Sequence, residues 1–400
     1  MRKFIRNLPV QTRRDAWVEI NLGAIEHNAR VIGKLLPKNL EMMAIVKADA
    51  YGHGAAMILP TLEASGVTMA GVAAMDEALH LRETGIEMPI LVIGVVPDWA
   101  VQYAADFDIQ LTIFSYAHLE SLQREYLRRK KRFKVHVKVD TGMHRIGIQW
   151  EQAAEFIRYC RTLEFIDLQG IFSHLADSHD LQMTQLQETR WRLLCADIAP
   201  LPPYVHLANT GQALSPFYQG ESALTGSAEA DFADKNPMPE TLVRVGIGFF
   251  GYGIHPARQN IGLQPAMSLK ARIVHLQTVP TGTGVSYSHR FITQRQSVIA
   301  TVPVGYADGV PRRLSGKIYG LLAGQLAPQV GNITMDQMMF DVTSIAGVSI
   351  GDTLVLIGEE KAEDAPVQKI WLDDWAEKAD TIPYELMCGL RVRLPKTYTR

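Results

Sequence analysis

The first 250 residues of the chain alternate short apolar runs with longer amphipathic stretches. Eight runs have the length and composition of buried strands: MMAIVKA, MAGVAA, PILVIG, IQLTIF, KVHVKVD, LQGIFSH, YVHLA and TLVRVGI. Stretches with helical spacing of apolar residues, such as DEALHLRETG and WEQAAEFIRYCRTL, lie between the first seven runs. Parallel strands need crossover connections, and these are usually helices. The pattern therefore predicts an α/β fold with a TIM-type (β/α)8 barrel over residues 18–262.

The rhythm changes after about Gly253, where strands and turns follow one another without long helices. Five stretches carry this pattern: LKARIVHLQTVP, SVIATVPVGYADG, KIYGLLAGQ, MMFDVTS and DTLVLIG. They predict a mostly β C-terminal domain over residues 263–400, which we expect the N-terminal segment 1–17 to join. Residues 215–240 are rich in Pro, Gly and acidic side chains, and we expect them to form a surface insertion before the eighth strand.

Composition narrows the class of protein. A chain of 400 residues, 47% of them hydrophobic, is long enough for more than one packed core. The formal net charge of −2 gives no reason to expect a nucleic acid or a membrane as the main partner. The chain shows no signal-peptide core and no apolar window long enough to span a membrane, so we expect a cytoplasmic protein. Its three cysteines, Cys160, Cys195 and Cys388, are widely separated and predict no metal site.

Polar residues gather where several predicted barrel strands end, which is the side on which such barrels carry their catalytic groups. They are Lys47, Lys138, Arg145, His174, Asn209, Thr210, Arg244 and Gly246. Cations combined with hydroxyl and backbone N–H groups suit a phosphorylated anion. A lysine amine can also form a Schiff base with an aldehyde. Pyridoxal 5'-phosphate meets both conditions, because its phosphate anchors it and its ring accepts the electrons of an α-carbanion.

A set of ordered motifs resembles the alanine racemases: VKADAYGHG, VKVDTGMHRIG, VRVGIGFFGYG, GVSYSH, VGYADG, TMDQMM and TIPYE. The resemblance runs from about Trp17 to Pro395, apart from residues 215–240. It implies a barrel with pyridoxal phosphate at its mouth, followed by a β domain. It also implies racemisation of L-alanine and D-alanine, which supplies D-alanine for bacterial peptidoglycan, and a homodimer whose active sites are shared between chains.

The resemblance assigns two acid/base groups. Lys47 resembles the Schiff-base lysine, which serves one face of the substrate, and Tyr287 resembles the base on the opposite face. Racemisation needs both, because the Cα proton leaves one face and returns to the other. A phenol ordinarily has a pKa of about 10, so we expect Arg145 and nearby cations to assist it.

The cofactor-binding residues also follow from the resemblance. Arg244 resembles the arginine that meets the pyridine nitrogen, where a permanent cation opposes ring protonation and limits side reactions. His174 is expected to support Arg244 through a hydrogen bond. The remaining cofactor contacts, most of them to the phosphate, are implied for Tyr51, Asn209, Thr210, Gly246, Ile247 and Tyr384.

Substrate-binding groups come from both predicted domains. Arg145 and the backbone of Met335 match groups that meet the substrate carboxylate or the phenolic oxygen of the cofactor, and Asp336 is a candidate for orienting this part of the site. Lys138 matches a lysine that is N-carbamylated in many family members. A carbamate would turn its positive charge into an anion that can hold Arg145.

Alternatives stay open at this stage. A racemase acting on serine or on a broader set of amino acids would use the same groups, although the small pocket expected from Tyr287, Tyr384 and Met335 favours alanine. A non-enzymatic protein that binds pyridoxal phosphate would lack the β domain, Tyr287 and the TMDQMM motif. A decarboxylase would need an acidic partner at the pyridine nitrogen, where this chain has Arg244. The chain departs from the family pattern at Thr210, where many members have serine, at Thr334, where cysteine is common, and at His144, where glycine is frequent.

Overall fold

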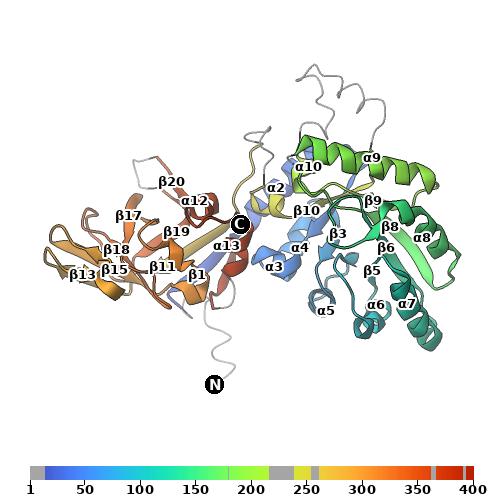
Figure 1. The fold of residues 1–400 in the computed structure, drawn as a ribbon. Coiled ribbons are helices and arrows are strands. Elements are labelled where there is room, and N and C mark those ends of the chain that lie inside the picture. Colours follow the sequence, from blue (N-terminus) through green and yellow to red (C-terminus); the bar gives the residue numbers. More distant parts are fainter. Residues whose placement is uncertain (1–13, 179, 216–237, 254–260, 362–365, 391–392) are drawn as a thin grey trace, which may run out of the picture. The chain divides into compact units, whose positions relative to one another are not determined.

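The computed structural model describes residues 14–178, 180–215, 238–253, 261–361, 366–390 and 393–400 (Figure 1). Its contacts divide the chain into two compact units, which we describe separately. The barrel unit comprises Ile25–Ala50 and Gly54–Gln264. The β unit comprises Met1–Ala24, Tyr51–His53 and Pro265–Arg400. The N-terminal residues 1–13 and most of the expected insertion, 216–237, lie outside the described residues.

Eight parallel strands form the sheet of the barrel unit, in the order β10-β2-β3-β4-β5-β6-β8-β9. The strands are β2 (Glu41–Ile45), β3 (Val67–Val72), β4 (Ile90–Val92), β5 (Ile109–Ile113), β6 (Phe133–Asp140), β8 (Ile166–Phe172), β9 (Tyr204–His206) and β10 (Leu242–Val245). A short strand, β7 (Ile148–Gln149), also pairs with β6. The N–H groups of Thr241 and Arg244 donate to the carbonyls of Val205 and Ala208 at 3.0 and 3.1 Å, which brings β10 next to β9. The barrel is thus nearly closed, and the predicted fold and all eight predicted strands are confirmed.

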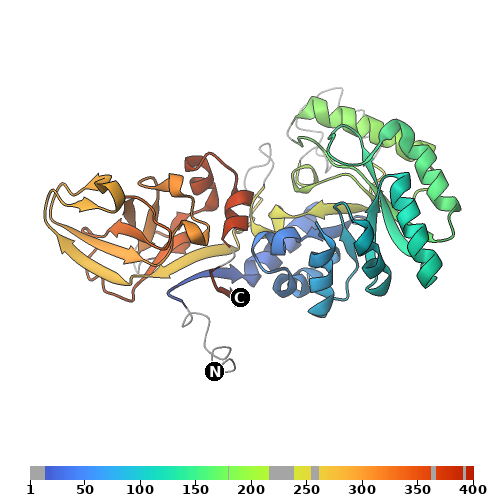
Figure 2. The ribbon, with the colours of Figure 1, turned by 60° about the horizontal axis from the view of Figure 1, so that its bottom comes forward.

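Helices of the barrel unit lie outside its strands (Figure 2). They are α2 (Leu22–Leu35), whose first turn belongs to the β unit, α4 (Ala55–Glu63), α5 (Met75–Glu83), α6 (Val101–Asp106), α7 (Tyr116–Arg129), α8 (Trp150–Thr162), α9 (Leu181–Asp197) and α10 (Thr210–Ala213). Some begin at polar caps: Ser115 accepts a hydrogen bond from His118 N, and Asp180 accepts one from Met183 N at 2.9 Å. Because helices cover the outside and side chains fill the inside, the strands are buried on both faces and read as continuous apolar runs.

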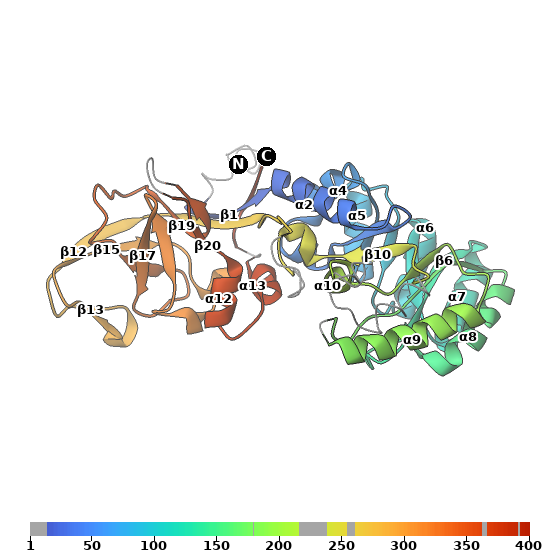
Figure 3. The same cartoon turned by 90° about the horizontal axis from the view of Figure 1, so that it is seen from above.

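The β unit is built on one large sheet, in the order β12-β15-β18-β17-β16-β19-β11-β1-β21, with β20 on β19 (Figure 3). Its strands are β1 (Ala16–Asn21), β11 (Met267–Arg272), β12 (His275–Val279), β15 (Ser297–Val302), β16 (Tyr319–Leu322), β17 (Gln325–Val330), β18 (Met338–Asp341), β19 (Thr353–Glu360), β20 (Gln368–Ile370) and β21 (Lys396–Thr399). A hairpin of β13 (Gly284–Val285) and β14 (Phe291–Ile292) stands apart, and two helices, α12 (Leu372–Lys378) and α13 (Pro383–Gly389), follow the last long strand. The mostly β character of this unit confirms the second part of the predicted fold.

Strand β1 was not predicted as a strand. It pairs antiparallel with β11 and parallel with β21, so both described ends of the chain lie in the sheet of the β unit. The domain boundaries given above, at residues 17, 262 and 263, stay predictions. Among the described residues, no helix is both long and apolar enough to cross a membrane.

Candidate active site

The segment after β2 carries Lys47 on an unusual backbone. The short α3 (Lys47–Tyr51) contains Ala48, Asp49 and Ala50 with φ of 55°, 54° and 55°, and Tyr51 follows with φ 54°. These four successive residues have the left-handed conformation, which costs L-residues roughly 1–2 kcal/mol each. Strain of this kind persists only where the surroundings hold it.

Two carboxylates hold this left-handed turn. Glu77 in α5 accepts hydrogen bonds from Ala48 N at 2.6 Å and from Ala73 N at 2.7 Å, one with each oxygen. Asp49 accepts a hydrogen bond from Ala55 N at 2.8 Å. The half-buried Lys47 therefore leaves the strand through a turn that is fixed at both of its ends.

His174, just beyond β8, lies within electrostatic reach of four cations. Burial, and then the positive charges around it, lower the pKa of its imidazole to about 2. These charges are those of Arg244, Lys138, Arg145 and Lys47. The cations come from three strand ends: Lys47 follows β2, Lys138 and Arg145 belong to β6 and the loop after it, and Arg244 lies in β10. The barrel thus brings these four predicted residues together around His174.

Arg244 is buried within β10 and donates to neutral acceptors. Its Nη1 donates to His206 Nδ1 and to the His206 carbonyl, both at 2.9 Å. Its Nη2 lies 2.8 Å from the carbonyls of Ser173 and Leu207, and 3.1 Å from His174 Nδ1. The last contact places His174 where the sequence expected it, beside Arg244. None of these five acceptors neutralises the guanidinium charge.

His206 was missed by sequence reasoning, although it is a direct partner of Arg244. It occupies β9, is fully buried and stacks on the Phe172 ring at 4.8 Å between centroids. Burial, and then the charge of Arg244, hold its pKa well below the usual value. The available signal was an uncharged polar ring inside an apolar strand, which has to be hydrogen-bonded when buried.

Lys138 in β6 is buried, and its Nζ lies 4.9 Å from the centroid of the Phe172 ring. Burial holds its pKa well below the ordinary value; the charges of Arg244 and Arg145 lower it further, and Asp140 opposes them. The neutral amine is therefore favoured more than it is for an exposed lysine.

Asp140 shapes the loop that carries the exposed Arg145. One of its oxygens accepts the N–H groups of Gly142, Met143 and His144 at 2.9, 3.0 and 3.1 Å. His144 has a positive φ of 53°, a conformation that a glycine would adopt at less cost.

The predicted phosphate-binding residues of the barrel unit lie together. Thr210 begins α10, and its hydroxyl accepts a hydrogen bond from Gly246 N at 3.0 Å. Asn209 caps the same helix by accepting from Gln212 N at 3.0 Å. Ile247 begins the 3₁₀ turn η4 (Ile247–Phe250) directly after Gly246.

The other predicted residues belong to the β unit. The Tyr51 and Tyr384 rings are 5.9 Å apart between centroids. Tyr287 is 71% exposed, and its carbonyl accepts a hydrogen bond from Asn332 Nδ2 at 2.8 Å.

Met335 is exposed in the loop after β17, and this loop is joined to a second one. The Met335 carbonyl accepts from Ala307 N at 3.0 Å. Asp336 pairs with Arg393 at 2.8 Å, and Arg393 also lies 3.4 Å from the buried Asp308. Asp336 is thus part of an ion cluster that ties the Met335 loop to the neighbouring turn.

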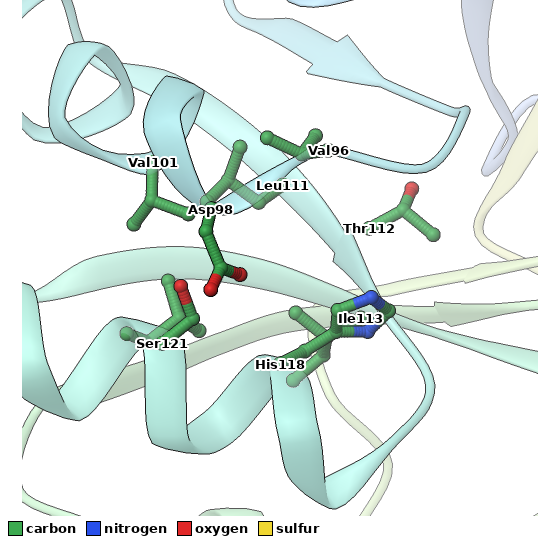
Figure 4. A pocket seen from close by; sticks show the side chains of 9 residues that line it. Val96, Asp98, Val101, Leu111, Thr112, Ile113, His118 and Ser121 are labelled. Atoms are coloured by element: carbon green, nitrogen blue, oxygen red, sulfur yellow. The ribbon is translucent and has the colours of Figure 1, made fainter.

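A small cavity lies elsewhere in the barrel unit, beside β5, α6 and α7 (Figure 4). It has room for about one water molecule. His118 lines it; its Nδ1 accepts from Phe114 N at 3.2 Å, and burial lowers its pKa. None of the predicted site residues lines this cavity.

The donor set fits pyridoxal phosphate better than it fits a metal. Lys47 offers an amine for the aldehyde, and the converging cations and the Thr210 hydroxyl suit an anionic ring and its phosphate. Among the described residues, no group of three or more His, Cys, Asp or Glu side chains could hold a metal ion.

Comparison with known proteins agrees with this donor set. The family models for the N-terminal and C-terminal domains of alanine racemase match residues 20–253 and 266–398. The alanine racemase of Nostoc sp. is 39% identical over 391 residues, which are 95% of each chain. The structure of alanine racemase from Bartonella henselae with covalently bound pyridoxal phosphate is 28% identical, with a TM-score of 0.80, over 96% of this chain and 99% of that one. The histidine racemase of Leuconostoc mesenteroides is 29% identical, with a TM-score of 0.83, over 97% and 98%. The chain belongs to the alanine racemase family of isomerases.

Proposed function

We propose that this chain interconverts L-alanine and D-alanine with pyridoxal phosphate and two bases, Lys47 and Tyr287. The observation that carries the proposal is the convergence on His174 of four basic side chains, one of which is Lys47. The family match and the pyridoxal phosphate bound to the Bartonella henselae relative support it. The same family match supports the further proposal that the product D-alanine is supplied for peptidoglycan.

The cofactor supplies an aldehyde for covalent attachment and a conjugated ring that delocalises the electron pair left at Cα. The amine of Lys47 removes or returns the Cα proton on one face of the substrate. The hydroxyl of Tyr287 does so on the other face, because inversion requires groups on opposite sides. Arg145 and the backbone of Met335 orient the substrate carboxylate, with Asp336 and its partner Arg393 holding the Met335 loop.

Arg244 faces the pyridine nitrogen in this proposal. Its guanidinium is a permanent cation and donates to neutral acceptors, so it opposes protonation of that nitrogen. Tyr51, Asn209, Thr210, Gly246, Ile247 and Tyr384 complete the cofactor site.

Lys138 is carbamylated in this proposal. Its neutral amine, favoured by burial, attacks carbon dioxide, forms an N–C bond and releases one proton. The resulting anion accepts hydrogen bonds from Arg145 and offsets the positive charges of Arg145, Arg244 and Lys47.

Each active site is shared between the chains of a homodimer in this proposal. Tyr287 is highly exposed in the single chain, as expected of a group that acts in a partner's site. A twofold axis would generate two equivalent sites.

The test is incubation of the purified protein with single L-amino acids, with and without added pyridoxal phosphate, followed by chiral chromatography. We expect D-alanine to form, and Lys47→Ala protein serves as the control. L-serine and L-histidine belong in the same panel, because the similarity to a histidine racemase gives a broader or different substrate range a specific basis. No D-alanine from cofactor-loaded protein, or faster turnover of another amino acid, would contradict the assignment to alanine.

A further inference from the structure

A row of buried polar side chains continues from Arg244 into the barrel. His206 Nε2 lies 3.0 Å from His136 Nδ1, and His136 Nε2 lies 2.7 Å from Gln110 Oε1. Gln110, His136 and His206 come from β5, β6 and β9, and each is at most 5% exposed. Barrel interiors are ordinarily filled by bulky apolar side chains, so a polar row at this place needs a reason.

Strand β8 lies between β6 and β9 in the sheet, so the row has to pass over β8. It does so at a glycine. Gly170 is the register partner of His136 on one side and of Tyr204 on the other. A Cβ at this position would lie 2.4 Å from His136 Nδ1, the atom that meets His206. The Tyr204 ring stacks on His136 at 5.8 Å between centroids. Gly170 therefore leaves the space through which the two imidazoles meet.

Hydrogen-bond chemistry gives this row a direction. The guanidinium of Arg244 can only donate, so His206 Nδ1 accepts, and a neutral ring then carries its proton on Nε2. That proton is donated to His136 Nδ1, which leaves the His136 proton on Nε2 for Gln110 Oε1. Two neutral imidazoles can connect a donor to an acceptor, but they cannot connect two donors. The Gln110 amide must therefore present its oxygen.

Both imidazoles are held in the neutral form on which this direction depends. Burial, and then the charge of Arg244, lower the pKa of His136 to about 3. The pKa of His206 is also held well below its usual value, first by burial and then by the charges of Arg244 and Lys138. A proton on His206 Nδ1 would point at the Arg244 N–H groups and remove the acceptor they use.

We propose that Gln110, His136 and Gly170 form a positioning relay, which fixes the tautomer of His206 and thereby the orientation of the Arg244 guanidinium. The relay acts through Arg244, and none of its members touches the cofactor or the substrate. Its effect on catalysis rests on the proposed function, whereas the tautomers themselves do not.

The first test is nitrogen NMR of histidine-labelled full-length protein loaded with pyridoxal phosphate. The one-proton signature of each ring, assigned by substitution, should show His136 and His206 protonated on Nε2 alone and unchanged from pH 5 to pH 8. A proton on Nδ1 of either ring, or titration of either ring in this range, overturns the relay. This measurement needs no racemase activity, so it separates failure of the relay from failure of the proposed function.

The second test compares His136→Leu with His136→Asn. Leucine removes the acceptor for His206 Nε2–H, whereas asparagine keeps an acceptor oxygen near the position of Nδ1. We expect His136→Leu to lose the single tautomer of His206 and to lower kcat for alanine by about tenfold, and His136→Asn to restore much of both. An unchanged His206 signal in His136→Leu overturns the relay, whatever the rate. An unchanged kcat with an altered His206 signal overturns its positioning role. If His136→Leu fails to fold, the spectrum of the wild-type protein still decides.

Discussion

Replacing Glu77 by glutamine should disturb Lys47 without touching it. The left-handed turn from Ala48 to Tyr51 costs about 4–8 kcal/mol in total, at roughly 1–2 kcal/mol for each of its four residues. Glu77 offsets part of this cost through its bonds to Ala48 N and Ala73 N, and a hydrogen bond to a charged group contributes about 1.5–3 kcal/mol. Glutamine has one acceptor oxygen, so it keeps one bond and turns an NH₂ group toward the other N–H.

The loss of one such bond shifts the balance between the left-handed turn and other conformations by about 10- to 150-fold. We expect kcat/KM for alanine to fall by at least about tenfold in Glu77→Gln, because Lys47 serves both attachment of the cofactor and proton transfer. The assays are chiral detection of D-alanine and the visible absorbance of protein-bound pyridoxal phosphate. Glu83→Gln is the matched control, since it makes the same chemical change at an exposed position of α5. A kcat/KM within twofold of the wild type in Glu77→Gln, with cofactor binding intact, would refute the reasoning.

Three further predictions follow from the site. Lys47→Ala and Tyr287→Phe chains should each be nearly inactive. When the two are unfolded and refolded together, about half of the randomly paired dimers are mixed and each mixed dimer has one intact site, so about one quarter of wild-type activity should return. Mixed dimers without activity would exclude a shared site. Arg244→Glu should raise the ratio of transamination to racemisation, because a carboxylate favours a protonated pyridine nitrogen. The ratio is measured as pyruvate against D-alanine. The control Arg244→Lys keeps a cation and should change this ratio less. The pKa of His136 is lowered on folding, so its contribution to stability is complete above about pH 6.5 and declines as the pH falls toward 3. The free energy of unfolding, measured in urea, should fall between pH 8 and pH 5.5 by about 1.4 kcal/mol less in His136→Asn than in the wild type. An equal fall in both proteins would contradict a neutral buried ring.

The barrel strands could be predicted from the sequence because strands buried on both faces leave continuous apolar runs. Strand β21, with the sequence KTYT, leaves no such run, since its residues are half-buried or exposed and it is recognisable only through its pairing with β1. Likewise, the sequence KADAY contains no glycine to indicate a left-handed turn, and Glu77, one of the two carboxylates that hold this turn, lies 29 residues after Ala48.

Candidate site residues were predictable where a motif or a strand end marked them, as for Lys47 and Arg244. Their partners inside the barrel were not predictable. The hydrogen bond between His136 and His206 depends on the register of two strands that are separated by a third. The sequence around a histidine in an apolar strand does not indicate which residue of another strand its ring will contact. Gly170 in LQGIFSH gave the nearest hint, since glycine in a strand marks a close approach.

The left-handed turn also sets an order of events during synthesis. A ribosome delivers Lys47 well before Glu77, and until α5 packs against the barrel the Glu77 hydrogen bonds do not offset the cost of four residues in the left-handed conformation. A nascent chain that ends between these two positions therefore holds the lysine on a relaxed segment. The reactive amine reaches its working geometry only after the next strand and helix have folded, so the emerging chain is complete in this region before it can capture its cofactor productively.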